Sequence, residues 1–128
     1  SQGPFLVVVP PSLPVKNVKE LIALAKAKPN QLTFASSGAG SITQLATELF
    51  DDMAGIKMIH IPYKGTGPAL TDTMAGHVQI LFGSVGVTIP QLSSGRLRAI
   101  AVTTEKRIAA LPTMSSSLHA RRYRWKPP

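Results

Sequence analysis

The chain has 128 residues, a formal net charge of +8, 44% hydrophobic residues and 16% charged residues. This length suits one domain, and this composition supports a packed core and excludes a wholly disordered chain. The chain has no apolar run of about 18 residues, which excludes a membrane-spanning helix, and no cysteine, which excludes disulfides, thiolate metal sites and cysteine nucleophiles.

Strand-like and helix-like segments alternate along the chain. Short β-branched runs predict strands, and apolar residues at helical spacing predict helices. In chain order we expect a strand over 5–9, a helix between Asn17 and Pro29, a strand over 31–35, a helix over 42–54, a strand over 57–61, a helix over 68–75, a strand over 78–82, a short helix over 88–93 and a strand over 97–103. This order predicts an α/β fold with a small doubly wound sheet, mixed or parallel, and helices on both faces.

Capping residues mark the two longest helices. Asn17 with Glu20, and Ser41 with Gln44, have the three-residue spacing of a capping box. Gly55 follows the second helix and is its expected C′ residue.

The loop between the second strand and the second helix consists of small residues. Its glycines permit close backbone approach to a ligand, its serines add hydroxyl donors, and the following helix N-terminus favours an anion. The loop residues are Ser36, Ser37, Gly38, Ala39, Gly40 and Ser41. They fit a carboxylate or phosphate site, and they fit equally well a strand–helix turn without a ligand.

Two further loops follow the next two strands. Tyr63 in the first offers a ring face and a hydroxyl group, or else packs beneath its own loop, and we expect Lys64 to point into water. Gly83 and Ser84 begin the second. Ligands of open α/β sheets lie at the carboxyl ends of strands, so these three loops predict one rim with backbone donors.

Catalytic and metal-binding groups are scarce. His60, His77 and His119 have no metal-ligand spacing, and we expect each to be structural or exposed. Asp51 and Asp52 lie late in a helix and suggest a solvated face. The motifs GxGxxG, GxSxG and the P-loop are all absent. We therefore expect no catalytic residue, no metal and no cofactor.

Several segments resemble the second lobe of the Bug family, the TctC-type extracytoplasmic receptors of tripartite tricarboxylate transporters. They are NVKELIALAKAKPNQLTFASSGAGS, ATELF, MAGIKMIHIPYKGTGPALTDTMAGHVQILF and PQLSSGRLRAIAVTTEKRIAALP, within a match from about Leu6 to Pro112. The resemblance implies a periplasmic, non-enzymatic receptor whose two α/β lobes close over a small carboxylate. The implied ligands are amino acids, dicarboxylates, tricarboxylates or aromatic acids, and the implied partners are a first lobe and membrane transporter subunits.

The resemblance also implies site residues. Ligand carboxylate oxygens would meet the backbone and hydroxyl groups of residues 36–41, with Gln44, Tyr63 and Ser84 as further candidates. Members of the family often have histidine where this chain has Gln44 and aspartate where it has Gly83. Because of these departures, the identity of the carboxylate does not carry over.

The C-terminal residues depart from the family and are strongly basic. Residues 115–128 hold four of the 14 basic residues and no acidic residue. We expect residues 1–114 to form the lobe, with residues 1–16 as its crossing strand and linker, and 115–128 to be a basic tail outside it. No signal peptide is visible in the chain.

Three functions remain open at this stage. The first is one half of a carboxylate-binding cleft. The second is an orphan truncated lobe that binds no solute and acts as an interaction module or has no function, with self-association through the surface that a first lobe would cover. The third, binding of RNA or a membrane surface, rests on the basic tail alone, and we expect no nucleic-acid partner.

Overall fold

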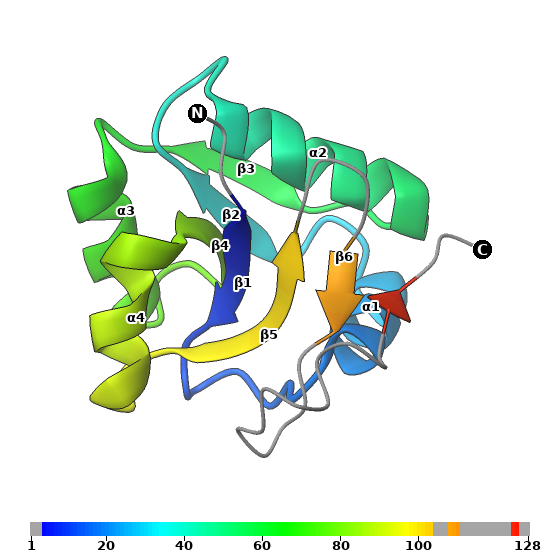
Figure 1. Ribbon diagram of the computed structural model, residues 1–128. Coiled ribbons are helices and arrows are strands. Elements are labelled where there is room, and N and C mark those ends of the chain that lie inside the picture. Colours follow the sequence, from blue (N-terminus) through cyan, green and yellow to red (C-terminus); the bar gives the residue numbers. More distant parts are fainter. Residues whose placement is uncertain (1–3, 104–107, 111–123, 126–128) are drawn as a thin grey trace.

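The computed structural model describes residues 4–103, 108–110 and 124–125 (Figure 1). The alternation of five strands and four helices is confirmed, and two short strands follow it. The elements are β1 (Phe5–Val9), α1 (Val18–Ala27), β2 (Thr33–Ser36), α2 (Ile42–Ala54), β3 (Ile59–Pro62), α3 (Thr66–Met74), β4 (Ile80–Ser84), α4 (Val85–Ser93), β5 (Arg98–Thr103), β6 (Ile108–Ala110) and β7 (Arg124–Trp125).

The described strands form one mixed sheet in the order β3-β2-β4-β1-β5-β6-β7. Strand β2 pairs in parallel with β3 and β4, whereas β1 is antiparallel to both β4 and β5. The insertion of β1 between β4 and β5 places Phe5 opposite Ser84. The start of β1 therefore lies beside the carboxyl end of β4.

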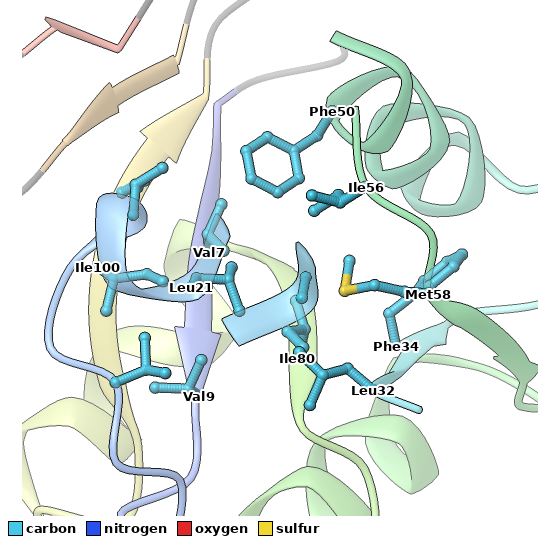
Figure 2. Packing of buried hydrophobic residues seen from close by; sticks show 14 of the residues in the cluster. Val7, Val9, Leu21, Leu32, Phe34, Phe50, Ile56, Met58, Ile80 and Ile100 are labelled. Carbon is cyan, nitrogen blue, oxygen red and sulfur yellow. The ribbon is translucent and has the colours of Figure 1, made fainter. Parts of the chain in front are cut away.

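Helices cover both faces of the sheet, and the alternation of side chains along β1 divides the core in two. Val7 and Val9 belong to a cluster with apolar residues of α1 and α2 (Figure 2). Leu6 and Val8 belong to a second cluster with apolar residues of α3 and α4. Successive strand residues point to opposite faces, so a continuous apolar run such as β1 requires helices on both sides.

The expected strands over 31–35, 57–61 and 78–82 each begin two residues too early. Leu32, Met58 and Val78 precede the observed strands and are buried. These side chains are therefore buried before the strands begin. An apolar pattern predicts which side chains are buried and does not predict where the strand begins.

Two helices begin earlier than the sequence predicts. Helix α3 starts at Thr66 and not at Pro68. The backbone N–H groups of the first turn have no acceptor within the helix, so a proline at any position of that turn loses no hydrogen bond. Helix α4 starts at Val85 and not at Thr88, directly after β4, so Gly86 is helical.

The caps of α1 and α2 are confirmed. The Glu20 amide donates to Asn17 Oδ1 at 2.8 Å, and the Gln44 amide donates to Ser41 Oγ at 3.2 Å. In both helices the reciprocal bond of the predicted capping box is displaced by one residue. Glu20 Oε1 accepts from the Lys16 amide at 2.8 Å, and Gln44 Oε1 accepts from the Gly40 amide at 2.6 Å. Gly55 ends α2 with φ of 69°, a left-handed conformation that glycine adopts without strain.

The expectation of a solvated face for Asp51 and Asp52 is right for Asp52, which is exposed, and wrong for Asp51, which is buried. Asp51 lies four residues after the buried Thr47 and therefore on the same inward face of α2. Burial raises the pKa of Asp51 to about 7, against the lowering effect of a hydrogen bond from the Met58 amide.

The expectation that residues 115–128 lie outside the lobe falls almost wholly on residues that the structure does not describe, and it stays a prediction. The described exceptions are Arg124 and Trp125, which form β7 and pair with β6 at the edge of the sheet. His119 also lies outside the described residues.

Candidate functional site

The carboxyl ends of β2, β3 and β4 lie at one edge of the sheet because these strands are parallel. A small cavity of about 50 Å³ opens there, which we call the strand-end cavity. Four hydroxyl-bearing residues line it together with an apolar base: Ser37, Thr43, Thr66 and Ser84, with Phe5, Ala69, Leu81 and Phe82. No charged side chain lines this cavity among the described residues. Its polar character comes entirely from hydroxyl and backbone groups.

Three helices begin around the strand-end cavity. Thr43 belongs to the first turn of α2, Thr66 begins α3, and Ser84 precedes α4. The N-cap residues of α3 and α4, Gly65 and Ser84, make no side-chain capping bond. Unpartnered amides at helix N-termini attract anions, so the hydroxyl groups lie where a carboxylate would be favoured.

The loop of residues 36–41 uses several of its own donors internally. The Ser37 amide donates to Thr43 Oγ1 at 3.1 Å, the Gly38 amide to Ser36 Oγ at 3.2 Å and the Ser41 amide to the Gly38 carbonyl at 3.2 Å. The Gly40 amide donates to Gln44, as described above.

Among residues 37–41 only the Ala39 amide remains, and the amides of Ile42 and Thr43 follow it in the first turn of α2. These three amides have no hydrogen-bond acceptor within the described part of the chain. Of the predicted backbone donors at residues 37–41, only the Ala39 amide is therefore available to a ligand, and two amides that were not predicted, those of α2, lie beside it. The loop is best described as a preorganised turn that leaves three amides available.

The candidate site residues differ in their surroundings. Ser37 and Ser84 line the strand-end cavity. Ser36 is fully buried, and its Oγ lies 2.6 Å from His60 Nε2. The side chain of Gln44 bonds to the Gly40 amide and to Glu48.

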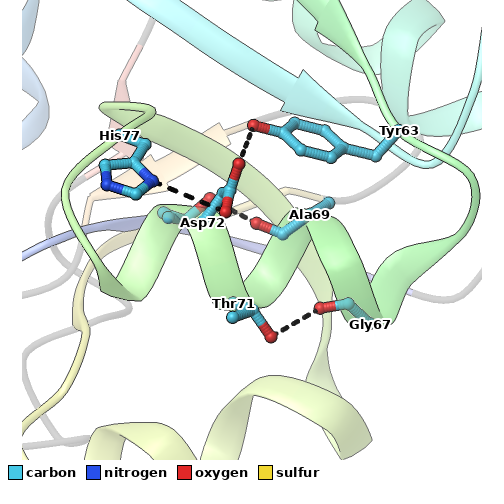
Figure 3. A network of polar contacts seen from close by, with 7 residues as sticks. Tyr63, Gly67, Ala69, Thr71, Asp72 and His77 are labelled. Carbon is cyan, nitrogen blue, oxygen red and sulfur yellow. Dashed lines mark hydrogen bonds and ion pairs between the residues drawn. The ribbon is translucent and has the colours of Figure 1, made fainter.

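Tyr63 contacts α3 and not the strand-end cavity (Figure 3). Its hydroxyl donates to Asp72 Oδ2 at 2.8 Å, and Asp72 Oδ1 lies 3.6 Å from His77 Nδ1. Burial and this carboxylate partner raise the pKa of Tyr63 to about 12. Tyr63 thus packs against α3 and the second core cluster, away from the strand-end cavity, and Lys64 is exposed as expected.

The glycine at position 83 has a steric reason. A Cβ atom on Gly83 would lie 2.2 Å from Thr88 Cγ2. The Thr88 side chain is buried, and its Oγ1 donates to the Ser84 carbonyl at 2.8 Å. An aspartate at position 83, which the family often has, would require the Thr88 side chain to shift.

The sequence reading missed four residues that shape the site. Thr43 was identifiable as a polar residue in the first turn of a predicted helix, whereas Thr66 precedes the helix that the sequence predicts from Pro68. Phe5 reaches the site only because β1 inserts between β4 and β5, and His60 only because β3 lies beside β2. No sequence signal gives that strand order.

Residues 1–121 match the family described as the tripartite tricarboxylate transporter family receptor. The chain belongs to this receptor family. BugT of Bordetella pertussis is 36% identical over 115 residues, which cover 88% of this chain and 35% of that protein. The tripartite tricarboxylate transporter receptors are solute receptors and not a class of enzymes.

Solved structures agree with this membership. Rpa4515 of R. palustris with adipate is 40% identical, with a TM-score of 0.78 over 82% of this chain and 35% of that one. A TctC solute-binding protein from Polaromonas is 30% identical, with a TM-score of 0.75 over 82% of this chain and 36% of that one. The chain therefore spans about a third of the length of these relatives.

Two further observations concern the described residues only. None of their helices has the length and apolar character that would carry it across a membrane. They also contain no group of three or more histidine, cysteine, aspartate or glutamate side chains arranged to hold a metal ion.

Proposed function

We propose that this chain supplies one half of a cleft that binds a small carboxylate, as the second lobe of a periplasmic receptor for a tripartite transporter. The observation that carries this proposal is the strand-end cavity, an uncharged hollow with four hydroxyl groups and three helix N-termini around it. Such a site neutralises an anion with dipoles and needs no metal or cofactor.

A dicarboxylate is the ligand class that we favour. The adipate of the R. palustris structure is a dicarboxylate held by a protein 40% identical to this chain. Here one carboxylate group would occupy the strand-end cavity, and the rest of the ligand would extend toward a first lobe. The first lobe and the membrane subunits of the transporter are the proposed partners.

Adipate titration followed by NMR tests this function on the 128-residue chain. We expect shifts of the amides of Ala39, Ile42 and Thr43 and a dissociation constant in the millimolar range or weaker. Three or four neutral hydrogen bonds contribute about 2–6 kcal/mol in total, and immobilising the ligand costs a similar amount. A dissociation constant in the micromolar range would refute the half-cleft argument. If no amide shifts at an adipate concentration about 50 times a dissociation constant of 1 mM, the chain does not bind adipate and the proposal is refuted.

A matched pair of serines sharpens the test. Ser84 lines the strand-end cavity, whereas Ser94 is exposed at the opposite end of α4. We expect Ser84→Ala to weaken adipate binding by about five-fold, the scale of one hydrogen bond, and Ser94→Ala to leave it unchanged. Equal affinities of the two variants would place the ligand elsewhere.

A second function, an interaction module, is favoured by an exposed apolar stripe on α2. Ile42, Leu45, Leu49 and Met53 are 46%, 60%, 53% and 36% exposed and follow helical spacing. None of the described residues covers this stripe, and we propose a second copy of the chain as the partner that does. Sedimentation should then show dimers that Leu45→Glu abolishes, while Val87→Glu on α4 does not. A monomer at millimolar concentration would refute this function.

A further inference from the structure

His60 is fixed by two contacts to strand β2. Its ring stacks on Phe34 with centroids 4.9 Å apart and planes 21° apart, and its Nε2 lies 2.6 Å from Ser36 Oγ. Both contacts arise because β2 and β3 are parallel neighbours with Phe34 opposite His60. The ring is therefore held against the last residue of β2, where the loop of the candidate site begins.

The hydrogen bonds around Ser36 decide which group donates. Ser36 Oγ donates to the Gly38 carbonyl at 3.0 Å and accepts from the Gly38 amide at 3.2 Å. A hydroxyl group has one hydrogen and two acceptor lone pairs. With its hydrogen on Gly38, Ser36 can only accept from His60, so Nε2 must carry a hydrogen for all three bonds to coexist.

These bonds form a continuous connection from the edge of the sheet to a helix. With a hydrogen on Nε2, His60 donates to Ser36. Ser36 in turn bonds to both backbone groups of Gly38, and the Gly38 carbonyl accepts from the Ser41 amide at 3.2 Å. Ser41 is the N-cap of α2. Gly38 has φ of +153°, so the loop conformation depends on what holds this residue.

A Ser–His pair also invites comparison with a hydrolase nucleophile, and the geometry argues against it. Ser36 is fully buried, and its oxygen is committed to Gly38. Among the described residues no carboxylate lies within ion-pair distance of His60. A serine nucleophile needs an accessible oxygen and an oriented base.

We propose that His60 acts through Ser36 as a positioning residue for the loop of residues 36–41. It holds Gly38 to Ser41 in the conformation that leaves the Ala39, Ile42 and Thr43 amides without protein partners. This proposal rests on the proposed function, because the loop is the expected ligand site. The effect of His60 on the hydrogen bonds between Ser36 and Gly38 can be measured without any ligand.

Four variants separate the contributions of the ring. His60→Phe keeps a ring that stacks on Phe34 and removes the donor, whereas His60→Gln keeps an N–H donor and removes the ring. Ser36→Ala removes the middle of the connection. His77→Phe is the control, because His77 is an exposed histidine beyond the C-terminus of α3.

The first readout is the exchange of the Gly38 amide with water, measured by NMR saturation transfer. We expect about five-fold faster exchange in His60→Phe and Ser36→Ala, the scale of one lost hydrogen bond. His60→Gln should stay within about two-fold of the wild type, and so should His77→Phe. Unchanged Gly38 exchange in His60→Phe would overturn the proposal.

The second readout is the adipate titration. His60→Phe should weaken binding by about five-fold, with recovery in His60→Gln. If the wild type binds no adipate, the proposed function fails and the exchange of Gly38 alone decides the positioning role. If core amides such as those of Val8 and Ile100 accelerate as much as Gly38, His60 is merely structural and the proposal is overturned.

Discussion

Helices α2 and α4 both begin at the candidate site, and they are stabilised in different ways. Helix α2 has a side-chain cap at Ser41, a left-handed glycine at its C-terminus and four buried residues. Helix α4 has no side-chain capping bond at Ser84, contains Pro90 and buries only Thr88. Proline lacks the amide that would continue the helix, so α4 has fewer bonds of its own.

The difference shows how the lobe combines stability with open donors. In α2 the capping residues use several loop amides and fix the loop. In α4 the uncapped N-terminus leaves donors for a ligand, and the close approach of Thr88 to Gly83 holds the helix against β4. Changes at the two helices should therefore have effects of different size and kind.

The largest effect is expected where α4 meets β4. Gly83→Ala places a Cβ 2.2 Å from Thr88 Cγ2, and overpacking of this kind costs about 2–3 kcal/mol of unfolding free energy. Thr88→Ser removes the clashing methyl group and keeps the hydroxyl bond to Ser84. Urea unfolding should show that Thr88→Ser restores most of the stability lost in Gly83→Ala. Additive losses in the double variant would mean that the contact is not the cause.

The next effect concerns the buried carboxyl group of α2. Burial raises the pKa of Asp51 to about 7 in the folded state, from about 3.9 in the unfolded state. Between these values the folded protein binds more protons, so its unfolding free energy falls as pH rises from about 4 to about 7. Asp51→Asn keeps an acceptor for the Met58 amide and removes this loss.

The rise of the pKa from about 3.9 to about 7 corresponds to about 4 kcal/mol, and solvent screening of a carboxyl group that is not wholly buried reduces this value. We therefore expect Asp51→Asn to be more stable than the wild type by about 1–2 kcal/mol at pH 8 and equally stable near pH 4. Urea unfolding at pH 4, 6 and 8 measures the difference. The matched control is Asp52→Asn, because Asp52 is exposed on the same turn of α2. If the difference in unfolding free energy between Asp51→Asn and the wild type is the same at all three pH values, ionisation of Asp51 does not destabilise the folded protein.

The smallest effects compare the two helix N-termini directly. Ser41→Ala removes the bond to the Gln44 amide and should cost about 1 kcal/mol. Ser84→Ala removes no capping bond and should change stability by less than about 0.5 kcal/mol. Thermal unfolding of both variants measures this contrast. Equal losses would mean that Ser84 caps α4 in solution, and the distinction between the helices would disappear.

Much of the fold was predictable from local patterns. The boundaries of α2, its Ser41 cap and its Gly55 terminus were all identified, because they depend on bonds between residues close in the chain. The starts of β2, β3 and β4 were misplaced because Leu32, Met58 and Val78 are buried although they lie before the first residues of these strands. Burial and strand pairing leave the same apolar signature.

The candidate site was predictable in part. The sequence indicated that loops rich in small residues follow three strands, and the parallel pairing of β2 with β3 and β4 brings them together. It did not indicate that Gln44 would bond to Gly40, or that Tyr63 would bond to Asp72. Side chains choose among several acceptors, and that choice depends on the final geometry.

The sequence by itself determined the α/β alternation, the caps of α1 and α2 and the loop that is suited to an anion. These features depend on backbone conformations and hydrogen bonds that span a few residues. The tertiary structure alone decided that Phe5 borders the cavity, that His60 bonds to Ser36 and that Gly83 must accommodate Thr88. The first two depend on the order of strands in the sheet and the third on how closely α4 packs against β4, and no local pattern specifies either.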